Sequence, residues 1–161
     1  MRLFRPQPRI ALAAAAEADA IAALCRRAWE PFRGRIDERV IVDQVPSADE
    51  VTTWLTGGFE LFTATLDGEL AGVIRCSFPT GTCFADRLAV APERSGDGVG
   101  RALAEHAIAR ARRAGVTKVW VQAPTKLEEY VQLYRSLGFR ESAHLRAHQW
   151  EEDVTLLELH L

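Results

Sequence analysis

Residues 92–103 read PERSGDGVGRAL, in which three glycines at alternate positions lead directly into a helix-forming sequence. These glycines, Gly96, Gly98 and Gly100, are costly in backbone entropy, so a structural or binding requirement is expected there. A β-strand is predicted just before them, over residues 83–90. Free amides at a helix N-terminus point outward, and the helix dipole adds about half a positive charge. The stretch therefore predicts a site for a phosphate or diphosphate group.

The glycine spacing separates this site from two familiar phosphate motifs. The turn lacks a Gly-Lys-Ser/Thr ending, so it is not the P-loop of a nucleoside triphosphatase. A dinucleotide fingerprint needs G-x-G-x-x-G and an acidic residue about twenty positions later. Here the glycines are evenly spaced, and residues 116–123 contain no acidic side chain. A nucleotide-binding protein is thus a weaker alternative.

Periodicity outlines the elements around this turn. Strands are expected over residues 9–14, 61–66, 70–78, 83–90, 116–123, 139–146 and 154–160, and helices over 19–29, 47–56, 99–114 and 125–137. Ser47 with Glu50 and Thr125 with Glu128 have the spacing of capping boxes. Residues 30–45 follow no clear period and are expected to be a surface loop.

The order of these elements predicts one α+β domain over residues 1–161. It contains an antiparallel meander, a crossover helix, a parallel strand, another helix and a final strand pair. The length of 161 residues suits a single core.

Composition excludes several classes of function. The chain is 48% hydrophobic and 26% charged, with 20 basic and 22 acidic side chains and a net charge of −2. Such a balance gives no basis for general binding to nucleic acid or to an anionic membrane. The longest apolar run, residues 10–16, is too short to cross a bilayer. We weighed it as a signal peptide, because arginines precede it, and favour a strand leading into a helix.

Three cysteines, Cys25, Cys76 and Cys83, form neither a C-x-x-C motif nor a group with paired histidines. No metal site is expected from this pattern. Cys76 and Cys83 can face each other across a hairpin, but free thiols in a reducing cytoplasm are the simpler interpretation. The protein is therefore expected to be cytoplasmic.

Two segments resemble a known family. RLAVAPERSGDGVGRAL, residues 87–103, followed by YVQLYRSLGF, residues 130–139, is similar to the GNAT superfamily of acyl-CoA-dependent N-acetyltransferases. The resemblance implies a mixed, mainly antiparallel central sheet flanked by helices, with a splayed strand pair that admits acyl-CoA. It also implies acetyl-CoA as co-substrate and direct attack by a primary amine in a ternary complex. Homodimers are common in the family.

The same resemblance assigns the residues that hold the cofactor. The pyrophosphate motif falls on residues 95–100, and backbone amides before it hold the acetyl carbonyl and the pantetheine arm. The implied cofactor-binding residues are Leu88, Ala89, Val90, Ser95, Gly96, Asp97, Gly98, Val99, Gly100 and Arg101. Ser95 stands where the family usually has Arg or Gln, and Asp97 where a basic or neutral residue is common. These departures suggest weakened binding.

Two residues are candidates for the chemistry. Tyr134 aligns with the family tyrosine whose hydroxyl protonates the departing thiolate, although it also belongs to an apolar helix stripe and core packing is the alternative. Asp86 lies on the same strand face as Leu88 and Val90, by a period of two, and is a candidate general base. A solvated carboxylate beside Arg87 is the alternative for Asp86.

The acceptor site in this family lies beside the first two helices and the closing strands. By resemblance, Trp29, Glu30 and Phe32 are candidate substrate-binding residues. The acceptor is either a small-molecule amine or a protein amine. A non-catalytic domain that binds acyl-CoA as a sensor or interaction module is the rival to an enzyme, and Ser95 and Asp97 favour that rival slightly.

Overall fold

A seven-stranded sheet forms the centre of the computed structural model, which describes residues 6–161. The spatial order of the strands is β1-β2-β3-β4-β5-β7-β6, and every neighbouring pair is antiparallel except β4 and β5. The strands are β1 (Arg9–Leu12), β2 (Glu60–Leu66), β3 (Glu69–Ser77), β4 (Thr82–Val90), β5 (Lys118–Pro124), β6 (Arg140–Ala147) and β7 (Glu152–His160). The expected α+β class with a mainly antiparallel sheet is confirmed.

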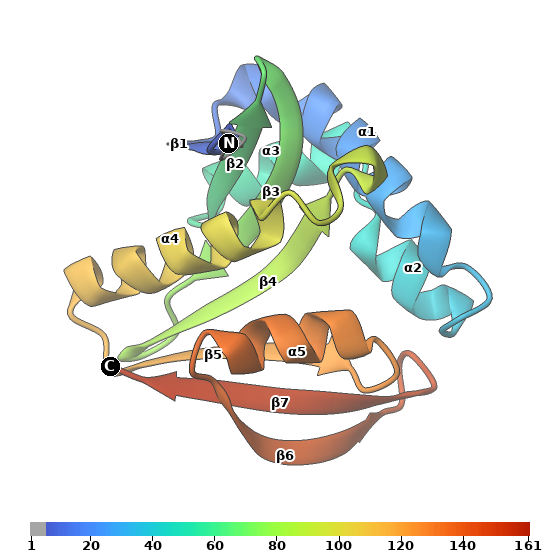
Figure 1. Ribbon diagram of the computed structural model, residues 1–161, viewed down its shortest axis with the longest axis vertical. Helices are drawn as coiled ribbons and strands as arrows, with labels where there is room; N and C mark the ends of the chain where they lie inside the picture. The colour runs from blue at the N-terminus through green and yellow to red at the C-terminus, as the bar shows by residue number, and fades with distance from the viewer. Residues whose placement is uncertain (1–5) are drawn as a thin grey trace, which may run out of the picture.

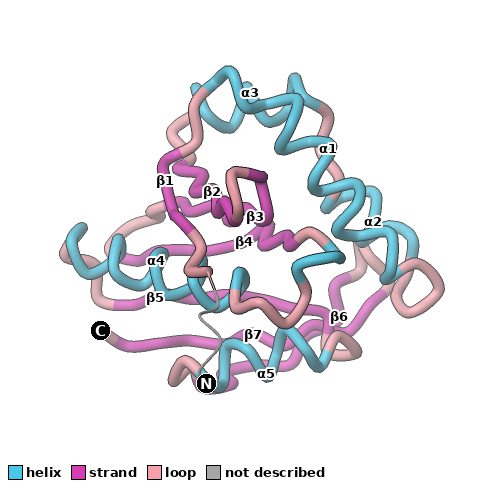
Figure 2. Tube along the Cα trace, turned by 45° about the horizontal axis from the view of Figure 1, so that its top comes forward, coloured by secondary structure: helices cyan, strands magenta, loops and turns pink. Residues whose placement is uncertain are grey.

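Helices cover the sheet on both faces (Figures 1 and 2). The helices are α1 (Ala18–Trp29), α2 (Glu38–Gln44), α3 (Ala48–Thr56), α4 (Val99–Ala114) and α5 (Glu128–Ser136). Figure 2 shows α1, α2 and α3 along the top and right of the view, α5 at the bottom, and α4 at the left beside β4 and β5. Short 3-10 turns at Ala15–Glu17, Glu30–Phe32 and Pro92–Arg94 complete the connections.

Each face of the sheet has its own apolar core. One core joins the buried side of α4, including Leu103 and Ala107, to strand residues such as Ile74. The other joins α1 to the opposite face, where Leu24 and Val73 are buried. Alternate residues of a strand point to opposite faces, so each central strand contributes to both cores.

The expected hairpin turn between β2 and β3 is present. Asp67 and Gly68 both have positive φ angles, 52° and 78°, as a tight two-residue turn requires. The α3 cap is also confirmed, because the Ser47 hydroxyl accepts from the Glu50 N–H at 3.1 Å. The three cysteines are buried free thiols.

The parallel strands β4 and β5 pair over only three residues each. Thr82–Phe84 lies opposite Lys118–Trp120, and beyond that rung the two strands separate. A bulge between β3 and β4 accompanies the separation, since Arg75 pairs with Asp86 but Val73 pairs with Ala89. Bulges bend a strand and increase its twist. The open end of the pair is where the candidate site lies.

The expectation of a loop over residues 30–45 is wrong for its second half. Residues 38–44 form α2, whose N-cap Asp37 accepts from the Arg39 N–H at 2.9 Å. The β-branched run Val40, Ile41 and Val42 has a low helix propensity, and seven residues are too few to show a helical period. Burial of Val40 and Ile41 against α1 stabilises this helix instead.

The second expected capping box is also wrong. Helix α5 begins at Glu128 without a side-chain cap. Thr125 instead continues the pairing with β7: its N–H donates to the Asp153 carbonyl at 2.9 Å, and its hydroxyl bonds the Thr155 hydroxyl at 2.9 Å. A strand partner that is distant in sequence thus takes the place of a local cap.

Candidate active site

A cavity of about 660 Å³, the larger cavity, lies where α4 begins. It runs between the end of β4, the N-terminus of α4, the exposed side of α5 and the segment that follows α1. Its lining residues include Leu88, Val90, Arg94, Ser95, Gly96, Gly98, Val99, Gly100, Arg101, Phe32, Arg35, Tyr130 and Leu133. The size is within the range of about 300–1,000 Å³ that small-molecule and cofactor sites have.

The glycines at one end of this cavity leave its backbone bare. Gly96 and Gly98 have φ angles of 85° and 80°, a conformation that favours glycine. A Cβ built on either one would meet no atom within 4 Å, so the space in front of the turn is open. The first hydrogen bond of helix α4 is donated by the Ala102 N–H to the Gly98 carbonyl, at 3.0 Å. The amides before it are those that a helix N-terminus presents to an anion.

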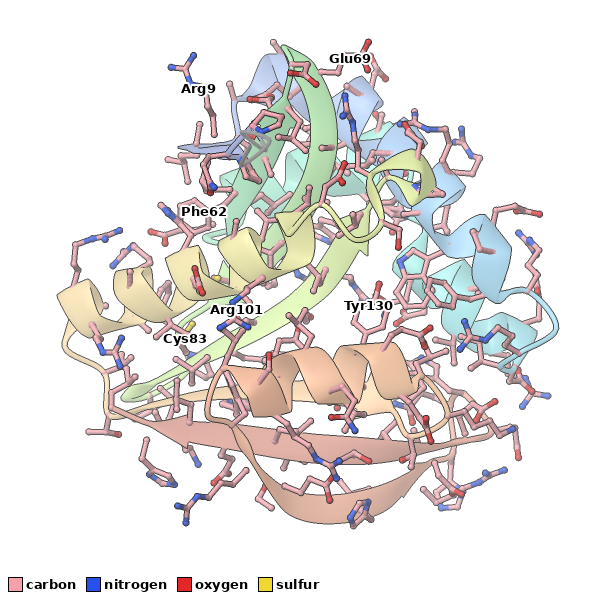
Figure 3. All side chains as sticks on the ribbon, viewed as in Figure 1. Arg9, Phe62, Glu69, Cys83, Arg101 and Tyr130 are labelled. Atoms are coloured by element: carbon pink, nitrogen blue, oxygen red, sulfur yellow. The ribbon has the colours of Figure 1, made fainter. Side chains whose placement is uncertain are left out.

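The Asp97 carboxylate lies beside an arginine of the same turn. This carboxylate does not line the larger cavity and lies 3.9 Å from the Arg94 guanidinium, which also pairs with Asp67 at 3.3 Å. Arg94 and Arg101 both line the cavity, and Arg101 donates to the Ser136 hydroxyl of α5 at 3.0 Å. Figure 3 shows Arg101 between α4 and α5. Arg101 also pairs with Glu105 at 3.0 Å. Two guanidinium groups therefore flank the bare backbone, each already beside at least one carboxylate.

The smaller cavity, of about 250 Å³, lies at the open end of the β4–β5 pair. It is lined by side chains from α1, α2, β4, β5, α5 and the β6–β7 turn: Trp29, Val40, Asp43, Gln44, Phe84, Asp86, Arg87, Leu88, Gln122, Ala123, Pro124, Tyr130, Tyr134 and Trp150. Leu88 and Tyr130 line both cavities. A ligand in one cavity therefore lies next to a ligand in the other.

Tyr134 is buried and lines the smaller cavity. Burial raises the pKa of its phenol well above the usual value, and nearby Tyr130 and Asp86 raise this pKa further. Its ring packs edge-on against Phe139, with centroids 5.4 Å apart. Within residues 6–161 its hydroxyl has no hydrogen-bond partner, whereas the Tyr130 hydroxyl donates to the Leu88 carbonyl at 3.1 Å. Tyr134 thus presents a protonated, free hydroxyl.

Asp86 is held by an arginine that the sequence did not point to. The Arg75 guanidinium donates to both Asp86 oxygens, at 2.8 and 2.6 Å. Trp54 and Phe59 pack on this guanidinium, with centroids 4.5 and 4.2 Å from its central carbon. The carboxylate is thereby fixed in place while it still lines the smaller cavity.

Arg87, the next residue, occupies the β4 bulge with a φ of 54°. A non-glycine residue in this region is strained, and such strain is common at functional sites. Its guanidinium donates to Asp43 of α2 at 2.9 Å, while its buried Nε has no partner among the described residues. The ion pair ties α2, one wall of the smaller cavity, to the bulge.

The structure brings most of the expected site residues together and leaves a few apart. Tyr134, Asp86 and Trp29 line the smaller cavity. Phe32 lines the larger cavity, and the exposed Glu30 lines neither and pairs with Arg33. The Ala89 side chain is buried in the α1 core. Its N–H lies on the β3 side of the strand, because Ala91, two residues later in the same register, donates to the Ala71 carbonyl of that strand.

Sequence reasoning missed several residues of the smaller cavity. Asp43 and Gln44 were assigned to a loop, and Phe84, Gln122 and Trp150 carried no motif. Period-two spacing from Asp86 would have found Phe84 on the same strand face. Trp150 lies in the short turn between β6 and β7, where no motif indicates that its side chain reaches a cavity.

Residues 6–161 contain no cluster of His, Cys, Asp and Glu side chains that could hold a metal ion. Among the same residues, no helix is long and apolar enough to cross a membrane.

A splayed strand pair beside a glycine-rich helix start is the architecture that the resemblance implied for an acyl-CoA-dependent acyltransferase. Residues 18–139 match the family model described as "Acetyltransferase (GNAT) family". The chain belongs to this family. The expectation of an acetyltransferase domain with acetyl-CoA as co-substrate is confirmed at the level of the family.

Known relatives include a curated enzyme from Escherichia coli, "[Ribosomal protein bS18]-alanine N-acetyltransferase". It is 32% identical over 83 residues, which are 50% of this chain and 55% of that protein. The chain thus spans about half the length of the curated relatives it matches. The crystal structure of the ribosomal-protein-S18-alanine N-acetyltransferase from Escherichia coli has a TM-score of 0.78 at 22% identity, covering 96% of this chain and 94% of that one.

A second similar structure is the PaiA N-acetyltransferase from Thermoplasma acidophilum in complex with coenzyme A. Its TM-score is 0.79 at 15% identity, with 96% of this chain and 99% of that chain covered. At these identities the two structures support the fold.

Proposed function

We propose that this protein is an N-acetyltransferase that moves the acetyl group of acetyl-CoA to a primary amine by direct attack in a ternary complex. The observation that carries the proposal is the meeting of the two cavities at Leu88 and Tyr130, with Tyr134 and Asp86 facing the smaller one. Acetyl-CoA fits the larger cavity, because its phosphates match the bare amides of α4 and the cations Arg94 and Arg101.

The chain's own residues supply the groups that the reaction needs. The amine nitrogen forms a bond to the acetyl carbon, and the carbon–sulfur bond breaks to release CoA as a thiolate. The nitrogen loses a proton to Asp86, directly or through a water, and the Tyr134 hydroxyl gives its proton to the thiolate sulfur. Because the Ala89 N–H lies toward β3, the backbone amides of Leu88 and Val90 are the candidate donors to the carbonyl oxygen, and one such donor is worth about 10²–10³-fold in rate.

A protein amine is the acceptor class that we favour. The curated relatives act on the alanine of a ribosomal protein, as their names state. The smaller cavity, at about 250 Å³, suits a short amine-bearing group. Its two carboxylates, Asp43 and Asp86, are each paired with an arginine, so the cavity offers no surplus negative charge to a polyamine. A small-molecule amine is the alternative.

The first test is ligand binding followed by turnover. Acetyl-CoA at 100 times its Kd should stabilise the protein by about 2.7 kcal/mol, whereas ATP and NADH should give no comparable rise in melting temperature. Release of free CoA thiol in the presence of an amine panel then measures transfer. Binding without release of CoA by any amine would favour the sensor module, and a failure to bind would contradict both.

Two expectations remain predictions here: cytoplasmic location and a homodimer. Light scattering after size-exclusion chromatography checks the second.

A further inference from the structure

Two aromatic rings lie where β4 and β5 separate. Phe84 and Trp120 are register partners on the last paired rung, and their rings stack with centroids 3.9 Å apart and an interplanar angle of 16°. Both side chains are partly exposed, on the side of the sheet opposite the α4 core. Stacked aromatic pairs that are not covered by the protein are frequent components of recognition surfaces.

Phe84 and Trp120 extend the surface of the smaller cavity outward along the sheet. Phe84 lines the cavity, whereas Trp120 does not. Asp86 and Gln122, two residues further along the same strands and on the same face, lie inside it. The two strands therefore carry a strip that runs from the carboxylate at the reacting centre to the aromatic pair.

The spacing along the strip matches an extended peptide. Two residues of a strand span about 7 Å, which is the separation between successive same-face positions of any extended chain. An amine placed at Asp86 therefore brings the second or third residue of its own chain over the aromatic pair. The cavity itself, at about 250 Å³, is smaller than the roughly 300–1,000 Å³ of drug-sized ligand sites.

Charge around the strip favours an apolar partner. Asp86 is neutralised by Arg75, and at the outer end Lys118 pairs with Glu158 at 3.0 Å, next to Trp120 in the sheet. Because these charges are paired, the main interaction that the strip offers a ligand is burial of apolar side chains against the two aromatic rings.

We propose that Phe84 and Trp120 select the acceptor by its sequence. The acceptor is a polypeptide N-terminus whose first residue enters the smaller cavity and whose second or third residue places an apolar side chain on the two rings. This inference rests on the proposed acetyl transfer and adds the acceptor's length and sequence preference.

The test compares three acceptors that share one amine: alaninamide, a hexapeptide beginning Ala-Gly-Gly and the same hexapeptide beginning Ala-Leu-Leu. For the unchanged protein, kcat/KM should be about tenfold higher for the leucine peptide than for the glycine peptide, as expected for a leucine side chain that leaves water. In Trp120→Ala this preference should fall to less than about twofold, while kcat/KM for alaninamide stays the same.

Three controls separate recognition from loss of structure. Trp120→Phe keeps a stacked ring and should keep most of the preference. Leu145→Ala removes a leucine that is 52% exposed on β6, outside the strip, and should change none of the three rates. The rise in melting temperature with acetyl-CoA, measured for every variant, reports whether the cofactor site is intact.

The possible results are distinct. Three results would contradict peptide recognition by Phe84 and Trp120 while leaving acetyl transfer supported. The first is an equal kcat/KM for the two peptides, and the second is transfer to small amines but to neither peptide. The third is a fall in kcat/KM for alaninamide in Trp120→Ala that is as large as the fall for the leucine peptide. An absence of CoA release with every amine would instead contradict the proposed function and, with it, this inference.

Discussion

Tyr134 and Tyr130 lie one turn apart on α5 and differ in what their hydroxyls do. Tyr130 stacks on Trp29 with centroids 5.8 Å apart and donates to the Leu88 carbonyl. Tyr134 faces the smaller cavity, and its hydroxyl has no partner among residues 6–161. A hydroxyl that lines a cavity without a protein partner is free to give its proton to a ligand there, whereas the Tyr130 hydroxyl is already engaged. The contrast favours Tyr134 as the proton donor.

Replacing Tyr134 with Phe should lower kcat by at least about 10²-fold, because the departing thiolate loses its acid. The stabilisation by acetyl-CoA should not change, since the phenol is not needed to bind the phosphates. The matched control is Tyr130→Phe, which leaves the Leu88 carbonyl without its donor and should cost about 1 kcal/mol of stability but less than tenfold in kcat. Steady-state rates and urea unfolding of both variants check these values. An unchanged kcat for Tyr134→Phe would return Tyr134 to core packing.

We expect Arg94 to supply the positive charge that the family resemblance places one position later, at Ser95. We expect Arg94→Gln to raise the Kd for acetyl-CoA about tenfold, because the variant leaves Asp67 and Asp97 unpaired near the phosphates. The effect should shrink as salt is raised, since these groups are partly exposed. Titration calorimetry at low and high salt measures it. Asp97→Asn alone should tighten binding slightly, and adding it to Arg94→Gln should recover part of the loss; no recovery would argue against this electrostatic role.

At the scale of elements, the turn before α4 combines a conformational requirement with a binding one. Gly98 is the N-cap of α4 in the left-handed region, and its missing side chain leaves open space in front of the helix amides. The alternating glycines were enough to predict this turn from the sequence. Helix α2 was not predictable in the same way, because its stability comes from Val40 and Ile41 packing on α1 rather than from local propensity.

Gly98→Ala should separate the two requirements. The variant should lose about 1–2 kcal/mol of stability through the positive φ alone, and should lose acetyl-CoA binding by more than tenfold because the new Cβ stands where the phosphates approach. Gly58→Ala is the matched control: its φ is 92°, a Cβ there also meets nothing within 4 Å, and it lies at the end of α3 outside both cavities. It should lose similar stability and keep the ligand-induced rise in melting temperature. Equal binding by the two variants would remove the glycine turn from the cofactor site.

At the scale of the whole molecule, local patterns predicted the strands and the glycine turn, whereas contacts between distant segments built much of the smaller cavity. Asp86 illustrates the limit. A period of two predicted it on the strand face of Leu88 and Val90, and this is wrong, because the bulge at Arg87 breaks the period: Leu88 and Val90 pack with the α4 core, whereas Asp86 lies on the opposite face with an arginine from the neighbouring strand. Arg75 becomes a partner only through the β3–β4 register, and the bulge shifts that register by one residue. Trp150 and Asp43 likewise reach the cavity from a turn and a helix far apart in sequence.

The buried ionisable groups make the stability of the whole fold depend on alkaline pH. Burial raises the pKa of the Cys25 thiol to about 12 from 9.0, and it raises the pKa values of Tyr130 and Tyr134 in the same direction. Below pH 9 the thiol is protonated in both the folded and the unfolded chain, so its contribution to stability is fully present. Between pH 9 and 12 only the unfolded chain ionises Cys25, and the free energy of unfolding should fall by about 1.4 kcal/mol per pH unit from this group. Urea unfolding under reducing conditions at pH 8, 9.5 and 11 measures the slope.

The control is Cys25→Ala. This variant should be less stable at pH 8 because it leaves a small cavity, yet its stability should fall less steeply above pH 9, until the two tyrosines add their own loss above pH 10. Parallel curves for the two proteins would mean that Cys25 ionises as readily in the folded chain as in the unfolded one, and that the α1 core is open to water at its centre.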